Sequence, residues 1–300
     1  MTSSVRMCKV AGTSAPSFIL PNGACDTHTH IFMEGANAGA TAYRPPDASS
    51  ERHREVREQL GFARAIAVQP AAYGQDCTVL LDALRQGGGK LHGIASADGS
   101  CSAQELASMA QQGVVGLRFV EVADPGTGER YRGSVGFDTL AQLAPTMREL
   151  GLVAEVWADC DVLVAQASFL RSLGVPVIVD HMGKPGVSAG ADAQAFSALC
   201  GMLGEGWLWV KLSVCRVISG DPRYIAARPF HDRLVAANPE RLLWGSDWPY
   251  VRMDPAPDAG HLLDIFDKWI GGDAELRRMI LSDNPARVFG FDAYQGGGSQ

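Results

Sequence analysis

Eight short apolar segments recur at steady intervals along the chain, and stretches with helical character lie between them. Several segments consist almost entirely of Val, Ile, Leu and Ala, which is typical of parallel strands covered on both faces. Eight strands that alternate with helices predict an α/β protein with a (β/α)8 TIM barrel. A doubly wound sheet is the main alternative, but no Gly-x-Gly-x-x-Gly fingerprint follows a strand. The expected strands are 24–30, 65–69, 91–97, 114–120, 152–158, 176–181, 208–214 and 242–247, and the expected helices are 51–60, 78–86, 102–112, 137–150, 162–173, 194–203 and 225–237. A further helix start is expected at residues 284–287 (Asn-Pro-Ala-Arg), an N-cap followed by proline.

The barrel would occupy residues 23–290 as one catalytic domain, after an N-terminal extension (1–22) and before a disordered tail (291–300). The net charge of −7 argues against a nucleic-acid partner. No apolar stretch approaches the roughly 20 residues that a membrane span needs. Seven cysteines without paired spacing, and no apolar leader of secretory length, predict a cytoplasmic protein with reduced thiols. The sequence leaves the oligomeric state open, with a homo-oligomer compatible with it.

Two histidines, His28 and His30, close the first expected strand. Side chains alternate along a strand, so residues two apart point to the same side. At the carboxyl end of a barrel strand, both rings would face the end where TIM-barrel active sites lie. The pair therefore predicts two nitrogens that converge on one metal ion or one substrate oxygen.

Two further polar groups follow expected strands. Residues 179–185 (Val-Asp-His-Met-Gly-Lys-Pro) end the sixth strand, and residues 243–249 (Leu-Trp-Gly-Ser-Asp-Trp-Pro) end the eighth. The first and eighth strands of a closed barrel are neighbours, so we expect Asp247 beside the histidine pair. His181 would approach from two strands further round.

Together the three motifs resemble the amidohydrolase superfamily (amidohydrolase-2 type), in particular the branch of 2-pyrone-4,6-dicarboxylate lactonases and related lactone hydrolases. The resemblance extends over nearly the whole chain, from about Gly23 to Gly290. It implies that His28, His30 and His181 surround the scissile carbonyl and that Asp247 activates the attacking water. Physical chemistry agrees with these roles, because donors aimed at a developing oxyanion stabilise it and a carboxylate accepts a proton from water.

The resemblance implies a metal in some members of this branch and metal-free catalysis in others. Many superfamily members have a fifth-strand histidine ligand, whereas here Glu155 and Trp157 hold the inward positions of residues 152–158. Three protein ligands and a water suffice for catalytic zinc. We expect a divalent ion, zinc first, at His28, His30 and Asp247, with metal-independent catalysis as the alternative.

Arg118 and Arg216 are the predicted anchors for an anionic substrate. Arg118 lies inside the fourth expected strand, where a buried charge needs a partner or a ligand, and arginine suits bidentate recognition of a carboxylate. Both arginines resemble carboxylate-binding residues of the pyrone-dicarboxylate enzymes. The alternative for Arg118 is an internal ion pair with Glu121 or Glu155.

Lys184 and Trp157 are further candidate substrate-binding residues, and both depart from the pattern of the branch. Lys184 stands where those enzymes have arginine, and Trp157 stands where they have tyrosine. Those enzymes have a second arginine in the fourth strand, and the matching residues here, 122–124 (Val-Ala-Asp), contain none. The pocket is therefore expected to take fewer or differently placed anionic groups.

The function that the resemblance implies is hydrolysis of a small lactone that carries a carboxylate or another anionic group. A sugar-acid lactone isomerase and a metal-dependent decarboxylase are alternatives from the same superfamily. A barrel that binds an anionic ligand without turnover is the non-catalytic alternative.

Overall fold

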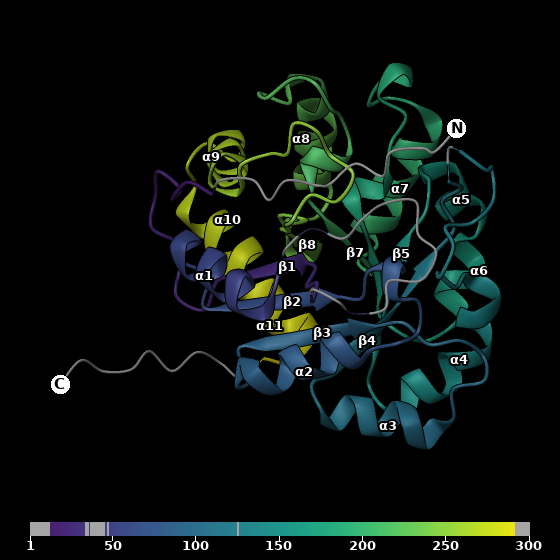
Figure 1. Cartoon of the computed structure of the whole chain (residues 1–300). Coiled ribbons are helices and arrows are strands. Elements are labelled where there is room, and N and C mark those ends of the chain that lie inside the picture. The colour runs from purple at the N-terminus through teal and green to yellow at the C-terminus, as the bar shows by residue number, and fades with distance from the viewer. Residues whose placement is uncertain (1–12, 34–35, 37–45, 47, 125, 292–300) are drawn as a thin grey trace, which may run out of the picture.

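The computed structural model describes residues 13–33, 36, 46, 48–124 and 126–291. Eight parallel strands lie side by side in chain order (Figure 1). The amide of Thr27 donates to the carbonyl of Trp244 (3.1 Å), and that of His30 donates to the carbonyl of Trp248 (2.8 Å). These bonds join the chain after the eighth strand to the first and confirm the predicted barrel. The strands are β1 (Cys25–Thr29), β2 (Arg64–Val68), β3 (Leu91–Ala95), β4 (Val114–Val120), β5 (Val153–Trp157), β6 (Val177–Val179), β7 (Leu208–Lys211) and β8 (Leu242–Leu243).

Helices surround the barrel (Figure 1). The predicted helix 162–173 is two short helices, and a predicted helix at 225–237 begins only at Arg228, after a 3₁₀ turn. Two helices near the C-terminal end, α9 and α10, were not predicted. The helices are α1 (Ser50–Leu60), α2 (Thr78–Gly87), α3 (Ala103–Gln111), α4 (Phe137–Glu149), α5 (Cys160–Ala165), α6 (Ala167–Ser172), α7 (Gln194–Gly204), α8 (Arg228–Ala237), α9 (Ala259–Trp269), α10 (Ala274–Arg278) and α11 (Asn284–Phe289).

Strands β6 and β8 are shorter than predicted, ending at Val179 and Leu243, and a residue in the left-handed conformation follows each of them a few residues later. His181 has a φ of 51° and Asp247 a φ of 63°, in the left-handed region that side-chain-bearing residues rarely adopt. Such backbone outliers are concentrated at functional sites, where the surrounding structure holds them.

The barrel interior has an apolar lower layer, at the amino ends of the strands, and a polar upper layer, at their carboxyl ends. A register shift between Asp26 and Thr29 in β1 lets Cys25 pack in the lower layer while His28 and His30 face the upper one. In the other strands, the inward-facing residues follow the regular two-residue period. The lower layer comprises Cys25, Ile66, Val68, Ile94, Val153, Ile178, Trp209, Leu243, Phe289 and Phe291.

Both predicted terminal segments contribute to the packing where they are described. Ser14 of the extension hydrogen-bonds to Asp258, the N-cap of α9, and Ser17 hydrogen-bonds to Asp264 within that helix. Phe291, which we assigned to the tail, is buried and stacks on His92 with ring centroids 4.0 Å apart. Residues 292–300 of the predicted tail lie outside the described residues.

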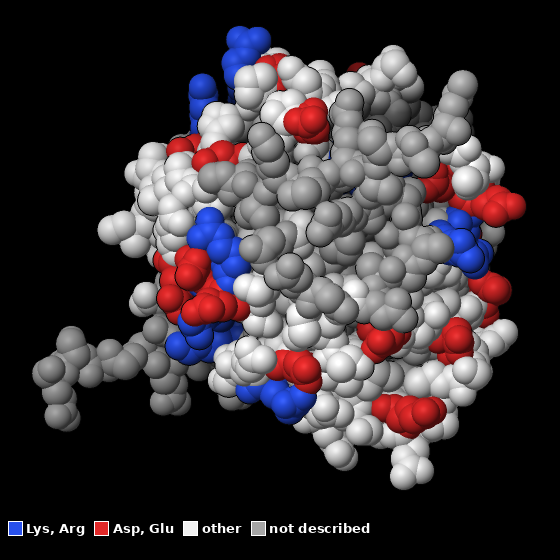
Figure 2. Space-filling model, viewed as in Figure 1, with Lys and Arg blue, Asp and Glu red and all other residues white. Residues whose placement is uncertain are grey.

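The face shown in Figure 2 carries acidic and basic side chains intermixed. On α1, for example, Arg52 pairs with Glu55 at 2.8 Å and Arg54 with Glu51 at 3.6 Å. Within the described ranges, no helix is both long enough and apolar enough to cross a bilayer.

Candidate active site

The histidine pair of β1 points into the upper end of the barrel, as predicted. The rings of His28 and His30 lie 5.1 Å apart between centroids, nearly perpendicular at 83°. Nδ1 of His30 donates a hydrogen bond of 2.7 Å to the carbonyl of Val68 in β2. This bond orients Nε2 of His30 toward Asp247.

Asp247 follows β8 and lies against both histidines. Its Oδ1 is 3.4 Å from Nε2 of His28 and 3.5 Å from Nε2 of His30, and its Oδ2 accepts a hydrogen bond from Nε of Arg216. The backbone amide of Asp247 donates to the carbonyl of His28 (2.9 Å), which fixes the turn. Burial alone would raise the pKa of this carboxyl, but the Arg216 guanidinium and the neighbouring histidines hold the pKa well below its usual range. The carboxylate is therefore ionised at neutral pH.

His181 approaches from the loop after β6, as expected. Its ring centroid is 4.8 Å from that of His28 and 5.8 Å from that of Trp157. Burial lowers the pKa of His181 to about 4, so its imidazole is neutral at physiological pH. Burial also lowers the pKa of His28 well below its usual value.

The predicted residues open onto a cavity of about 320 Å³. His30, His181 and Asp247 lie on its wall together with Arg118 and Arg216. His28 is completely buried next to them. The structure therefore brings all four predicted catalytic residues and both predicted arginines to one place.

Arg118 both lines the cavity and takes part in internal ion pairs. Its Nη2 is 3.5 Å from Oδ2 of Asp180, and its Nε is 4.0 Å from Oε1 of Glu155. Its guanidinium lies over the ring of Trp157, 5.6 Å from the centroid. Of the two predicted partners, Glu155 is the one present, because Glu121 pairs instead with Arg130 in the loop that follows β4.

Trp157 and Lys184 differ in their relation to the cavity. Trp157 lies on the wall, stacked against Tyr131 at 5.3 Å. Lys184 is not among the residues of that wall, and its Nζ pairs with Oδ1 of Asp159 at 2.8 Å. Arg252, from the loop after β8, is a further cation on the wall that the sequence analysis did not single out. It lies over the Tyr131 ring, 5.2 Å from the centroid.

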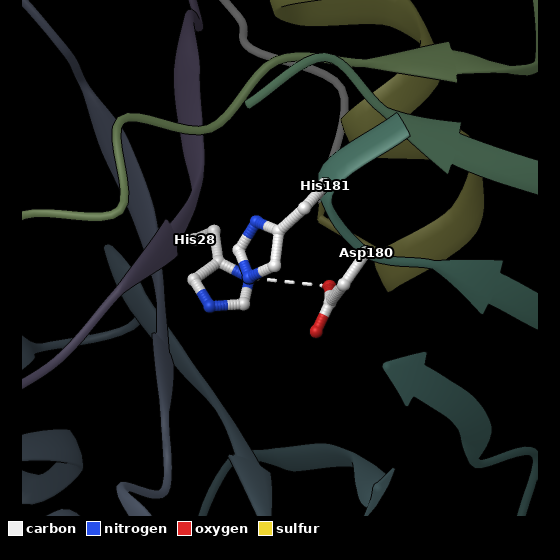
Figure 3. A group of neighbouring side chains, drawn as sticks. All are labelled: His28, Asp180 and His181. Atoms are coloured by element: carbon white, nitrogen blue, oxygen red, sulfur yellow. Dashed lines mark ion pairs between the residues drawn. The ribbon is translucent and has the colours of Figure 1, made fainter. Parts of the chain in front are cut away.

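Sequence reasoning also missed a buried polar cluster next to His28. Lys211 of β7, whose side chain is fully buried, contacts Glu155 and lies 3.1 Å from Nδ1 of His28 and 3.4 Å from Oδ1 of Asp180. Asp180 itself lies 3.2 Å from Nδ1 of His28, as Figure 3 shows. The available signal was a lysine within an otherwise apolar strand, at residues 208–212 (Leu-Trp-Val-Lys-Leu).

The pKa values of the two acids in this cluster, Glu155 and Asp180, are shifted in opposite directions. Burial, reinforced by the nearby Asp180 carboxylate, raises the pKa of Glu155 to about 8. Burial opposes ionisation of Asp180 as well, but His28 and Lys211 outweigh it and hold the pKa of Asp180 well below its usual range. A buried anion is thus retained beside the histidines, balanced by the Lys211 ammonium.

The divalent metal expected from sequence can be tested against this geometry. His28, His30 and Asp247 each offer one ligand-type atom, and these atoms lie within 4.8 Å of one another. Two of the three already contact a cationic side chain, because Lys211 lies against His28 and Arg216 against Asp247. A divalent ion would be repelled by both charges. The three residues are of types that bind metals, but the two neighbouring cationic side chains do not fit a metal, so no step of the reaction is assigned to one.

Known proteins of similar sequence and structure show the family to which this chain belongs. A 2-pyrone-4,6-dicarboxylate hydrolase of Comamonas testosteroni is 34% identical over 93% of this chain and 94% of its own. A 4-sulfomuconolactone hydrolase of Rhizobium radiobacter is 34% identical over 92% and 93%. The crystal structure of a putative 2-pyrone-4,6-dicarboxylic acid hydrolase from Pseudomonas putida is 29% identical, covers 91% of this chain and 100% of its own, and superposes with a TM-score of 0.79. The amidohydrolase family model matches residues 25–291, and the chain belongs to the amidohydrolase family.

Proposed function

We propose that this protein is a hydrolase that opens a small lactone bearing a carboxylate or another anionic group. The observation that carries the proposal is the position of Asp247, whose ionised carboxylate lies within 3.5 Å of Nε2 of both His28 and His30 on a cavity with arginines in its wall. The two curated relatives support the substrate class, since both are named for hydrolysis of lactones that carry acid groups.

The chemistry begins with Asp247 as general base. Its carboxylate takes a proton from water, and the resulting hydroxide attacks the lactone carbonyl carbon. His28, His30 and His181 surround the place of the carbonyl oxygen, where hydrogen-bond donors stabilise the negative charge that develops. Collapse of the tetrahedral intermediate breaks the ring C–O bond, and the proton held by Asp247 passes to the alkoxide that leaves. Water is consumed and the product is a hydroxy acid or its keto tautomer.

The arginines on the wall would hold the anionic group of the substrate. Arg118 and Arg216 present guanidinium groups to the cavity, and both pair with buried carboxylates that fix their orientation. Planar guanidinium groups recognise carboxylate and sulfonate oxygens through paired hydrogen bonds. Trp157 would pack on a planar lactone ring, and Lys184 would need to leave Asp159 to take part.

The test is a panel of carboxylated and sulfonated lactones assayed in ¹⁸O-water. Hydrolysis puts one labelled oxygen into the new carboxylate, whereas an isomerase produces an unlabelled lactone and a decarboxylase releases carbon dioxide. The matched control is each lactone with its acid group blocked as a methyl ester, which we expect to raise KM. Turnover without label, or equal turnover of the blocked substrates, would contradict the proposal.

A further inference from the structure

Lys211 is a buried cation that takes no part in the proposed hydrolysis steps. It lies on β7, and its side chain has no exposure to solvent. Three groups surround its Nζ: the carboxylate of Glu155, Nδ1 of His28 at 3.1 Å and Oδ1 of Asp180 at 3.4 Å. Burying an ammonium group is costly unless it is paired, so a lysine at this position needs an explanation.

The contact with His28 determines where the ring carries its hydrogen. An ammonium group has three donors and no acceptor, so Nδ1 of His28 must accept this hydrogen bond with its lone pair. Asp180 competes as an acceptor at 3.2 Å, yet within the described part of the chain its Oδ1 has no aligned hydrogen-bond partner. A neutral imidazole has one N–H, which then lies on Nε2.

Nε2 of His28 faces the reaction site. It is buried, has no hydrogen-bond partner among the described residues and lies 3.4 Å from Oδ1 of Asp247. A hydrogen on this atom is available to a substrate oxygen. His30 differs from His28 at the other ring nitrogen, because its Nδ1 must donate to the carbonyl of Val68 and therefore carries a hydrogen.

We propose that Lys211 is a positioning residue: its ammonium holds His28 as the Nε2–H tautomer, which makes His28 a hydrogen-bond donor to the oxyanion and removes the lone pair that a metal would need. The catalytic part of this inference rests on the proposed hydrolase function. The tautomer itself does not, since it is a property of the protein without substrate. Asp180, which stays ionised, balances the buried charge of Lys211, and Glu155 accepts a hydrogen bond from its ammonium.

The first experiment is ¹⁵N NMR of the histidine rings in the unaltered protein, with the His28 signals assigned by their loss in His28→Gln. We expect a protonated-type shift at Nε2 of His28 and an unprotonated-type shift at its Nδ1, and a protonated-type shift at Nδ1 of His30. A protonated Nδ1 on His28 would overturn the proposal, whatever substrate the enzyme uses.

The second experiment uses Lys211→Met together with Glu155→Gln at pH 9, above the pKa of about 8 of Glu155, where the two substitutions remove one positive and one negative charge and leave the net buried charge unchanged. Without the ammonium, Nδ1 of His28 is expected to take the hydrogen and donate to Asp180. The NMR pattern of His28 should invert, and kcat should fall about 10²-fold to 10³-fold with little change in KM, as for the loss of one oxyanion donor.

Glu155→Gln alone is the matched comparison, because it keeps the lysine and should keep the wild-type tautomer. If the double variant retained the wild-type tautomer and kcat, Lys211 would serve only to balance charge and the inference would be wrong. A wild-type protein that opened no lactone would refute the proposed function instead, while the tautomer would still decide the role of Lys211.

Discussion

Asp247→Asn is the sharpest perturbation of the proposed chemistry, because the fold should tolerate it. Asp247 has a φ of 63°, and Asn is among the few residues that adopt this conformation readily. The two backbone bonds of the turn, from Asp247 to His28 and from Tyr250 to Asp247, are both 2.9 Å and do not involve the side chain. We therefore expect the variant to fold, whereas Asp247→Ala would add backbone strain to the loss of the carboxylate.

The expected loss of rate follows from the contacts of the two carboxylate oxygens. Arg216 only donates, so the amide oxygen of Asn would face it and the amide NH₂ would face His28 and His30. The group presented to the attacking water would then be a donor and could not accept its proton. A general base contributes roughly 10²-fold to 10⁴-fold, so kcat should fall by that factor, or about 3–5 kcal/mol in activation free energy.

The assay is steady-state turnover of the best lactone from the panel, with circular dichroism and thermal unfolding to establish that the variant is folded. Asp98→Asn is the matched control, because Asp98 lies in the loop after β3 and its carboxylate accepts hydrogen bonds from the amide and hydroxyl of Ser100, its partners among the described residues. It should behave as wild type. A folded Asp247→Asn variant whose kcat stayed within a factor of about three of wild type would refute Asp247 as the base.

Three further predictions follow from the same contacts. Arg216→Gln removes the charge that offsets burial, so the pKa of Asp247 should rise and the acid limb of the kcat/KM profile should move to higher pH; an unmoved limb would show that Arg216 does not control this carboxyl. Gly245→Ala would bring a Cβ to 2.6 Å from Cβ of His28, so the free energy of unfolding measured in urea should fall by about 1–3 kcal/mol, and an unchanged midpoint would contradict that contact. Dialysis against a strong chelator should leave kcat unchanged and elemental analysis should find less than one metal ion per chain; a metal-dependent loss that zinc restores would reverse our interpretation of the donor set.

Much of the catalytic centre could be predicted from local sequence. The pairing of His28 with His30 requires only the two-residue period of a strand, and the structure has both rings on one side. Asp247 and His181 follow strands, and parallel strands of a barrel end at the same face. Lys184 also follows a strand, yet it pairs with Asp159 away from the cavity wall, because strand-end position does not specify which way a loop residue turns.

The sequence by itself thus predicted the barrel, the face on which the candidate site lies and the position there of the four residues proposed as catalytic, since each position depends on a short-range period or on strand order. Only the tertiary structure decided what those residues touch. Glu155 of β5, Asp180 directly after β6 and Lys211 of β7 meet at Nδ1 of His28 because closure of the barrel sets how far each strand is staggered against the next. That stagger is a long-range property, and it decides whether a buried lysine faces apolar side chains or a histidine ring.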